Sequence, residues 1–261
     1  MKPGITDDAS LVELLAARQG IVCAVGAGGK KTVLRAIAAA HPGRVAMTGT
    51  VPFLPPPESL AGERISGEPG VIAARLAASH LPRVVVYGRP AEKRGRWGGL
   101  PPECIREWHE RFGFDATLVK ADGARMRWIK APAATEPLLV TGCDTIIPVL
   151  SARALGEPLS SRIAHRVELV TAVTGCGEGE VFQPLHAARL LTQPAGLLQG
   201  TGDSEVRPVI NMVDDEKKLA LASEAAALAL DMTARFHQVV LTCLRQSVEV
   251  VAVMTQQRLP R

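Results

Sequence analysis

The sequence predicts an α/β protein of the P-loop type, with a doubly wound, mostly parallel sheet, helices on both faces and an antiparallel C-terminal edge. Three observations lead to this class. Short apolar runs alternate with longer amphipathic segments, as in successive βαβ units. A glycine-rich turn separates the first clear apolar run from an alanine-rich segment. The last two apolar runs have no helical segment between them, which favours an antiparallel hairpin.

The strands are predicted from short apolar runs. The clearest is 21–25, whose continuous apolar character is typical of a strand buried on both faces. The other predicted strands, in chain order, are 44–47, 84–87, 116–120, 145–149, 209–211, 239–241 and 248–253.

The helices are predicted from apolar residues at helical spacing and from helix-forming composition. Leu11, Leu14 and Leu15 share one face of a first helix, which ends near Gly20. The further predicted helices are 31–40, 71–80, 102–112, 162–174, 185–191 and 215–234. Because no segment requires a domain boundary, we expect one α/β nucleotide-binding domain over residues 1–261.

Composition excludes several classes of protein. Five Phe, three Trp and one Tyr in 261 residues offer few stacking platforms, so no nucleic-acid partner is expected. The N-terminus has no hydrophobic signal core and no apolar run reaches membrane-spanning length, so we expect a cytoplasmic protein without a membrane partner. Five scattered cysteines without a CxxC pair argue against a disulfide framework or a structural zinc site.

The positive charge is concentrated in one segment. The chain has 30 basic and 26 acidic residues, and residues 89–130 alone contain ten basic and six acidic ones. This segment therefore accounts for the whole net charge of +4. Such a local excess indicates a bound anion rather than a DNA-coating surface, and a solvated face is the alternative.

The glycine-rich turn predicts a phosphate-binding loop. Glycines let backbone N–H groups approach phosphate oxygens, and the start of the following helix adds partial positive charge. The pattern G-x-x-x-x-G-K-[ST] is incomplete, because Ala24 replaces its first glycine and Lys31 its Ser/Thr. The phosphate lysine is therefore Lys30 or Lys31. The predicted nucleotide-binding residues of the turn are Gly26, Ala27, Gly28, Gly29, Lys30, Lys31 and Thr32.

Oxygen-bearing side chains follow the strands whose ends meet this loop. Thr48 and Thr50 follow the second strand, and Asp122 follows the strand 116–120. Hydroxyl and carboxylate oxygens suit Mg²⁺, and P-loop proteins place a metal-binding carboxylate at such a strand tip. The predicted magnesium ligands are Thr32, Thr48, Thr50 and Asp122, with ordinary turn chemistry as the alternative.

A possible base-binding motif follows the strand 209–211. Asn211 and Asp214 form an N-x-x-D pattern similar to the N-K-x-D guanine-reading motif of GTPases, with Met212 in place of the lysine. The Asp214-Asp215 pair is equally suited to cap the next helix. ATP and GTP both remain open as the nucleotide.

The segment after Asp122 brings further charge to the mouth of the predicted site. Lys130 and Glu136 flank Pro132, which stiffens the backbone between them. His165 and Arg166 lie on a helical pattern. These residues suit an anionic second substrate or the charge of a transferring phosphoryl group, with a surface salt bridge as the alternative. The predicted catalytic residues are Lys30, Asp122, Lys130, Glu136, His165 and Arg166.

Together these motifs resemble the YqeC family, described as selenium cofactor biosynthesis or selenium-dependent molybdenum hydroxylase accessory proteins. The similar segments are 26–32, 48–50, 122–124, 130–132, 136–137 and 165–166. The resemblance covers residues 20–214, and it implies a nucleotide-dependent accessory role in maturing a selenium-containing centre. It also implies a selenium-containing second substrate and a molybdenum hydroxylase partner. The cysteines are expected to be passive, and an exposed Cys176 thiol in the Gly-Cys-Gly turn, suited to selenium chemistry, is the alternative.

Two functions follow from this interpretation. The first is a Mg²⁺-dependent P-loop enzyme that hydrolyses ATP or GTP or transfers a phosphoryl group. The second is a nucleotide-gated chaperone with little intrinsic catalysis, which docks its partner through the basic segment near Arg94, Arg96 and Trp97. A nicotinamide-binding protein is disfavoured, because no ribose-binding acid stands at the end of the second strand.

Overall fold

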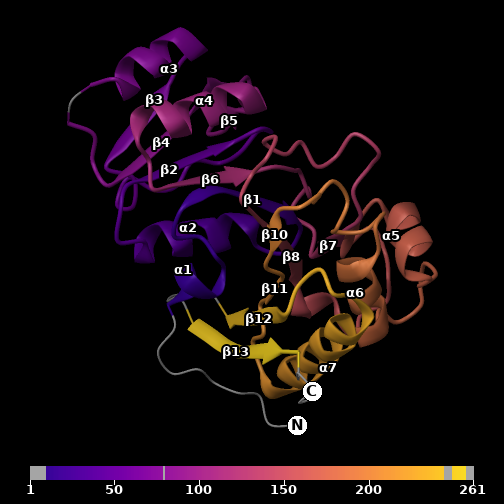
Figure 1. Cartoon of the computed structure of the whole chain (residues 1–261). Coiled ribbons are helices and arrows are strands. Elements are labelled where there is room, and N and C mark those ends of the chain that lie inside the picture. The colour runs from indigo at the N-terminus through magenta and orange to yellow at the C-terminus, as the bar shows by residue number, and fades with distance from the viewer. Residues whose placement is uncertain (1–9, 79, 244–248, 257–261) are drawn as a thin grey trace.

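A single large β-sheet runs through the computed structural model, which describes residues 10–78, 80–243 and 249–256 (Figure 1). The sheet order is β13-β12-β11-β8-β1-β6-β2-β4-β3, with β10 added beside β8 and β5 beside β4. The strands are β1 (Gly20–Gly26), β2 (Val45–Gly49), β3 (Glu63–Ser66), β4 (Val84–Pro90), β5 (Trp97–Gly98), β6 (Ala116–Lys120), β8 (Thr145–Ser151), β10 (Glu205–Val206), β11 (Val209–Asn211), β12 (Gln238–Cys243) and β13 (Glu249–Thr255). A separate two-stranded sheet pairs β7 (Ile129–Lys130) with β9 (Ala164–His165).

The strand pairs confirm the predicted fold class. Every pair in the path from β3 to β12 is parallel, and β13 closes the C-terminal edge by antiparallel pairing with β12. Residue 248 of the predicted last strand lies outside the described residues. The short strands β3, β5 and β10 have no counterpart in the sequence prediction.

Alternation along β1 explains how the two faces of the sheet are covered. Ile21 and Cys23 pack with α3 (Pro69–Leu76) and α4 (Pro102–Phe112). Val22 and Ala24 point to the other face, where α1 (Leu11–Leu14) and α2 (Lys30–Ala40) lie. Successive side chains of a strand alternate between faces, so an uninterrupted apolar run requires this two-sided cover.

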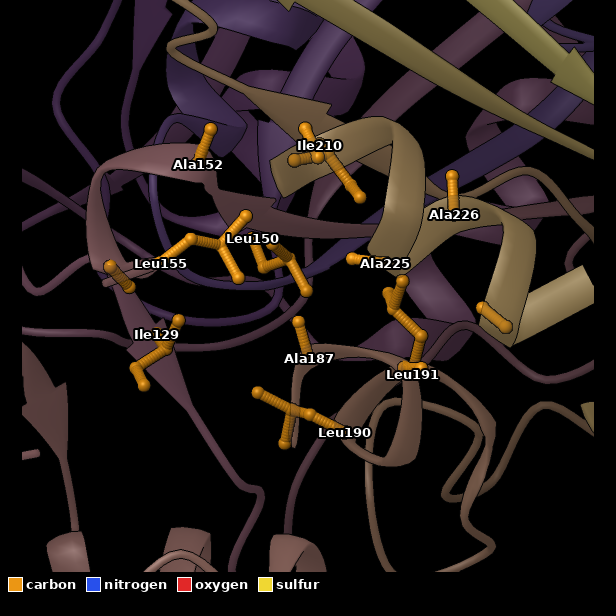
Figure 2. Packing of buried hydrophobic residues seen from close by; sticks show 14 of the residues in the cluster. Ile129, Leu150, Ala152, Leu155, Ala187, Leu190, Leu191, Ile210, Ala225 and Ala226 are labelled. Carbon is orange, nitrogen blue, oxygen red and sulfur yellow. The ribbon is translucent and has the colours of Figure 1, made fainter. Parts of the chain in front are cut away.

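A third group of helices covers the C-terminal half of the sheet. These helices are α5 (Val167–Thr174), α6 (Pro184–Thr192) and α7 (Glu216–Met232). In Figure 2, Leu191 of α6 lies close to Ala225 of α7, and Leu190 belongs to the same buried cluster, which also contains Leu150 of β8. The small alanine side chains of α7 let the two helices approach closely, and this packing fixes the segment between β7 and α5 against the sheet.

The fold places the predicted loop at a topological switch point. After β1 the chain continues to β2 on the side of β6, whereas it later returns to β8 on the opposite side of β1. The registers pair Ala24 with Lys120 and Gly26 with Val149, so the three carboxyl ends form one edge. Ligands of doubly wound sheets bind at this kind of crevice.

In the described part of the chain, no helix has both the length and the apolar character needed to cross a membrane.

Candidate functional site

The loop between β1 and α2 has a backbone that requires glycine. Gly26, Gly28 and Gly29 have φ angles of 88°, 75° and 127°. A Cβ at Gly28 would overlap Ser151, and one at Gly29 would overlap the amide of Asn211. The chain therefore needs glycine here both for conformation and for close approach.

The start of α2 presents open backbone donors. The N–H of Gly28 donates to the carbonyl of Arg127 over 3.1 Å. The N–H groups of Gly29, Lys30 and Lys31 have no acceptor among the described residues, and no side chain caps α2. Three adjacent donors at a helix N-terminus suit an anionic ligand.

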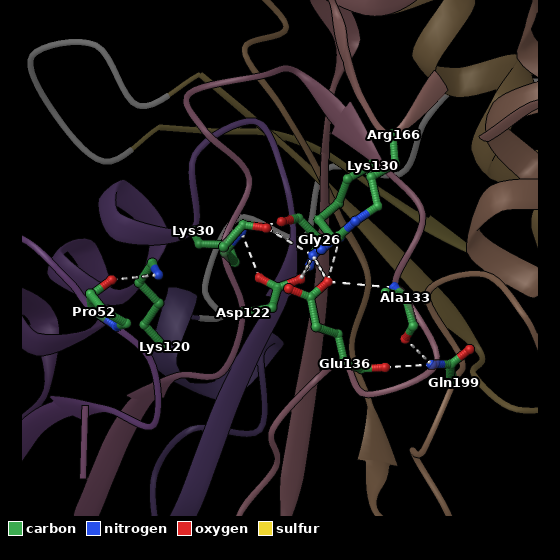
Figure 3. Close-up of polar contacts among 11 residues, drawn as sticks. Gly26, Lys30, Pro52, Lys120, Asp122, Lys130, Ala133, Glu136, Arg166 and Gln199 are labelled. Atoms are coloured by element: carbon green, nitrogen blue, oxygen red, sulfur yellow. Dashed lines mark hydrogen bonds and ion pairs between the residues drawn. The ribbon is translucent and has the colours of Figure 1, made fainter. Parts of the chain in front are cut away.

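Lys30 folds back onto Asp122, which lies just beyond the end of β6 (Figure 3). Its ammonium lies 2.8 Å from the carboxylate and also donates to the carbonyl of Gly26. The N–H of Gly26 donates to the other carboxylate oxygen over 2.9 Å. Both charged side chains are buried. Burial lowers the pKa of Lys30, and the negative charge of Asp122 partly opposes this effect.

Lys130 connects this pair to a second carboxylate. Its ammonium is fully buried, 3.0 Å from Asp122 and 2.7 Å from Glu136, and it donates to the carbonyl of Gly123. Arg166 contacts the same oxygen of Glu136 over 2.6 Å. Three cations therefore surround two carboxylates, and the cluster retains one positive charge.

Hydrogen bonds hold Glu136 ionised. Burial by itself raises the pKa of Glu136, but hydrogen bonds from Arg166 and Lys130 outweigh it and lower the pKa to about 2. Gln199 fixes the same turn, because its amide donates to the backbone carbonyls of Ala133 and Glu136.

The structure corrects the predicted helix 162–174. His165 lies in β9, opposite Lys130 of β7, and Arg166 precedes α5 with a φ of 64°. The carbonyl of Ile163 accepts the N–H groups of Trp128 and Ile129, so this segment pairs as a strand before the helix begins. His165 consequently lies beside the buried lysine. Burial, followed by the charges of Arg166 and Lys130, lowers its pKa and favours a neutral imidazole.

The predicted magnesium ligands do not form one coordination set. Asp122 is already paired with two ammonium groups. The hydroxyl of Thr50 donates to the carbonyl of Leu138, and Thr48 lines a small cavity together with Lys31 and Arg35 of α2. Thr32 is half-buried in the first turn of α2. No group of three His, Cys, Asp or Glu side chains in the described chain is arranged to hold a metal ion. Magnesium ligation by Thr32, Thr48, Thr50 and Asp122 stays a prediction.

The predicted base-binding residues contact the loop and a neighbouring arginine. The amide of Asn211 donates to the carbonyl of Gly28 over 3.0 Å and accepts from the hydroxyl of Thr242. Asp214 pairs with Arg153 over 2.7 Å. Asn211 thus holds the loop between β1 and α2, while Asp215 caps α7 as the sequence allows.

Sequence reasoning missed Lys120 and left two interpretations of Cys176. Lys120 ends β6 next to the loop, and burial, followed by the charge of Lys30, lowers its pKa to about 7. A lysine at the last position of an apolar strand was the available signal. Cys176 is buried rather than exposed, and burial, followed by Glu180, raises the pKa of its thiol. The burial excludes the alternative of an exposed thiol and agrees with the expected passive cysteine.

Comparisons with known proteins match the part of the chain that builds this site. The family described as YqeC protein matches residues 22–168, which contain the loop, Asp122, Lys130 and Glu136. An uncharacterized protein named YqeC from Escherichia coli (strain K12) is 27% identical over 196 residues, which cover 74% of this chain and 76% of that protein. Since the family match spans more than half of the sequence, the chain belongs to the YqeC family.

Proposed function

We propose that the chain is a P-loop protein that binds the phosphates of ATP or GTP at residues 26–32. One observation carries the proposal: three open N–H groups at the start of α2 stand next to a buried, net positive cluster at the switch point of the sheet. Phosphate oxygens would accept from the N–H groups of Gly29, Lys30 and Lys31.

In this proposal Lys30 exchanges its partner when the nucleotide binds. Its ammonium moves from Asp122 to a phosphate oxygen, and Asp122 keeps the N–H of Gly26 and the ammonium of Lys130. The carboxylate therefore remains compensated after the exchange. This arrangement favours Lys30 over Lys31 as the phosphate lysine.

The cluster beyond Asp122 would serve the second substrate. Arg166 is partly exposed, and together with Lys130 it offers positive charge to a transferring phosphoryl group. A neutral His165 beside Lys130 is able to accept a proton from an attacking hydroxyl or water. The reaction would break the terminal phosphoanhydride bond and pass the phosphoryl group to that oxygen.

Magnesium enters the proposal only with the nucleotide. Because Asp122 is already paired with two ammonium groups, the charge that neutralises the phosphates is assigned to Lys30, Lys130 and the N–H groups of the loop. The affinity of the chain for ATP and GTP, measured once with EDTA and once with excess Mg²⁺, checks this assignment.

The biological role is proposed from the family. As a YqeC protein, the chain is proposed to use its nucleotide in selenium cofactor biosynthesis or in maturing a selenium-dependent molybdenum hydroxylase. Steady-state turnover of ATP or GTP by the isolated protein supports the hypothesis that the chain is an enzyme. Nucleotide binding with turnover only in the presence of a partner hydroxylase supports the nucleotide-gated chaperone.

The decisive experiment is calorimetric titration with ATP, GTP and NAD. Lys30→Ala is expected to weaken nucleotide binding at least about tenfold, because it removes a charge-assisted hydrogen bond. Lys217→Ala, at an exposed position of α7, is the matched control. Unchanged affinity in Lys30→Ala would remove this lysine from the site, and no binding of ATP or GTP would refute the proposal.

A further inference from the structure

Two cysteines that are far apart in the sequence meet beside β1. Cys23 stands in the middle of β1, and Cys143 closes a turn just before β8. Both thiols are buried in the cluster that α3 and α4 cover, with exposed fractions of 0% and 4%. The two side chains are in hydrogen-bond contact and do not form a disulfide. The fold thus creates a pair of thiols that no spacing in the sequence indicates.

The backbone around the pair holds the two segments against each other. The N–H of Asp144 donates to the carbonyl of Ile21 over 3.0 Å, and the carboxylate of Asp144 accepts the N–H of Ile21 over 2.8 Å. The N–H of Val140 donates to the Cys23 sulfur, while the N–H of Cys143 donates to the carbonyl of Val140 over 3.0 Å. This turn therefore wraps around the Cys23 sulfur and keeps the second thiol next to it.

Cys143 is the member of the pair closer to solvent. Its neighbours Gly142 and Asp144 are exposed, whereas both neighbours of Cys23 in β1 are fully buried. Ser204 fixes Cys143 in place, because its hydroxyl donates to the carbonyl of Cys143 over 2.6 Å and lies 3.6 Å from the sulfur. A small molecule that enters from solvent therefore reaches Cys143 before Cys23.

Ionisation also differs between the two thiols. The hydrogen bond from Cys23 lowers the pKa of Cys143, although burial opposes this effect. The charges of Asp144 and Arg106 act on Cys143 in opposite directions. The hydrogen bond to Cys143, followed by burial, raises the pKa of Cys23 well above its usual value. Because the thiolate is the form that reacts with oxidants, ionisation and access both favour Cys143 as the first thiol to react.

We propose that Cys143 and Cys23 form a redox couple, in which hydrogen peroxide converts the two thiols into a disulfide. The Cys143 thiolate attacks one peroxide oxygen, the O–O bond breaks, and the sulfur becomes a sulfenic acid. The hydroxide that leaves takes up the proton that the Cys143 thiol has lost. The Cys23 thiol then attacks the oxidised sulfur, the S–O bond breaks, and water leaves with the thiol proton. Two thiols are oxidised, and one peroxide is reduced to two water molecules.

The disulfide would join β1 to the start of β8 beneath α3 and α4. It closes a loop of about 120 residues, which restricts the unfolded chain and is expected to raise Tm by about 10 °C. The pair lies outside the contacts that build the Lys30 cluster, so the proposal can be tested independently of nucleotide binding.

The test is oxidation of the folded full chain with a small excess of hydrogen peroxide, followed by alkylation of the remaining thiols, denaturation and peptide mapping. The unmodified chain is expected to give one linked pair of peptides, containing Cys23 and Cys143, which a reducing agent separates. Cys104→Ser, at a partly exposed cysteine of α4, is the matched control and is expected to form the same link. Circular dichroism of oxidised and reduced samples measures the change in Tm.

Single variants test the order of the two steps. In Cys23→Ala the sulfenic acid at Cys143 has no thiol to attack it and should be trapped by dimedone, whereas Cys143→Ala should leave Cys23 reduced. The linked peptides of the unmodified chain provide the test even if a variant fails to fold. Peroxide treatment that leaves both thiols open to alkylation, a link from Cys143 to another cysteine, or a link that lowers Tm would overturn the proposal.

Discussion

Lys130 is expected to be a main source of stability at the site, and Lys130→Met tests this. The substitution keeps most of the side-chain volume but removes contacts to Gly123, Asp122 and Glu136 at 2.8, 3.0 and 2.7 Å. Each charge-assisted hydrogen bond contributes about 1.5–3 kcal/mol to the free energy of unfolding. Part of this loss is offset, because the variant no longer has to bury a desolvated ammonium group. The net loss is expected to be about 3–5 kcal/mol, as for other broken buried ion pairs.

Thermal unfolding followed by circular dichroism measures this loss. For a chain of this size, each kcal/mol lowers Tm by about 2–4 °C, so Lys130→Met should lower Tm by about 6–20 °C. Arg111→Met is the control, because its ion pair with Glu107 is exposed on both sides and worth no more than about 1 kcal/mol. A Tm loss in Lys130→Met no larger than that of the control would refute the reasoning.

Three further predictions concern the same region. The pKa of Glu136 in the folded protein, about 2, lies below its ordinary value of 4.5. The ionised Glu136 therefore stabilises the fold fully above about pH 4.5, and this stabilisation is lost as the pH falls towards 2. The urea unfolding midpoint should fall over this pH range in the unmodified protein and depend less on pH in Glu136→Gln. Gly29→Ala should abolish ATP binding in calorimetry, because its Cβ meets Asn211, whereas Gly70→Ala, with open space around it, should bind normally. In an NMR titration the Lys120 ammonium should titrate near pH 7, and a midpoint near 10 would contradict its burial.

The mostly parallel class of the sheet and the position of the loop were predictable, because both depend on local patterns. An apolar run such as 21–25 requires helices on both faces of the strand. A glycine-rich turn between this run and an alanine-rich segment specifies a strand, a loop and a helix in that order. The strand end at Asp122 was predictable for the same reason, since parallel strands deliver their carboxyl ends to one edge.

What could not be predicted depends on contacts between distant segments. His165 and Arg166 fit a helical pattern, yet the pairing of β9 with β7 prevails over that local preference. Lys120 carries no motif, and its lowered pKa arises from burial beside Lys30, 90 positions earlier in the chain. The bond from Asn211 to Gly28 depends on a register that the sequence does not display, while base reading by Asn211 stays a prediction.

The bond from Asn211 to Gly28 has a consequence for synthesis of the protein. The loop between β1 and α2 is among the first parts of the chain to be made, but the amide that fixes it comes from β11, and the hydroxyl of Thr242 that orients this amide comes from β12. Chains elongate from the N-terminus, so a ribosome-bound fragment that ends before residue 211 carries the glycines without their support. The loop between β1 and α2 therefore acquires these supporting hydrogen bonds only after β11 and β12 have been made.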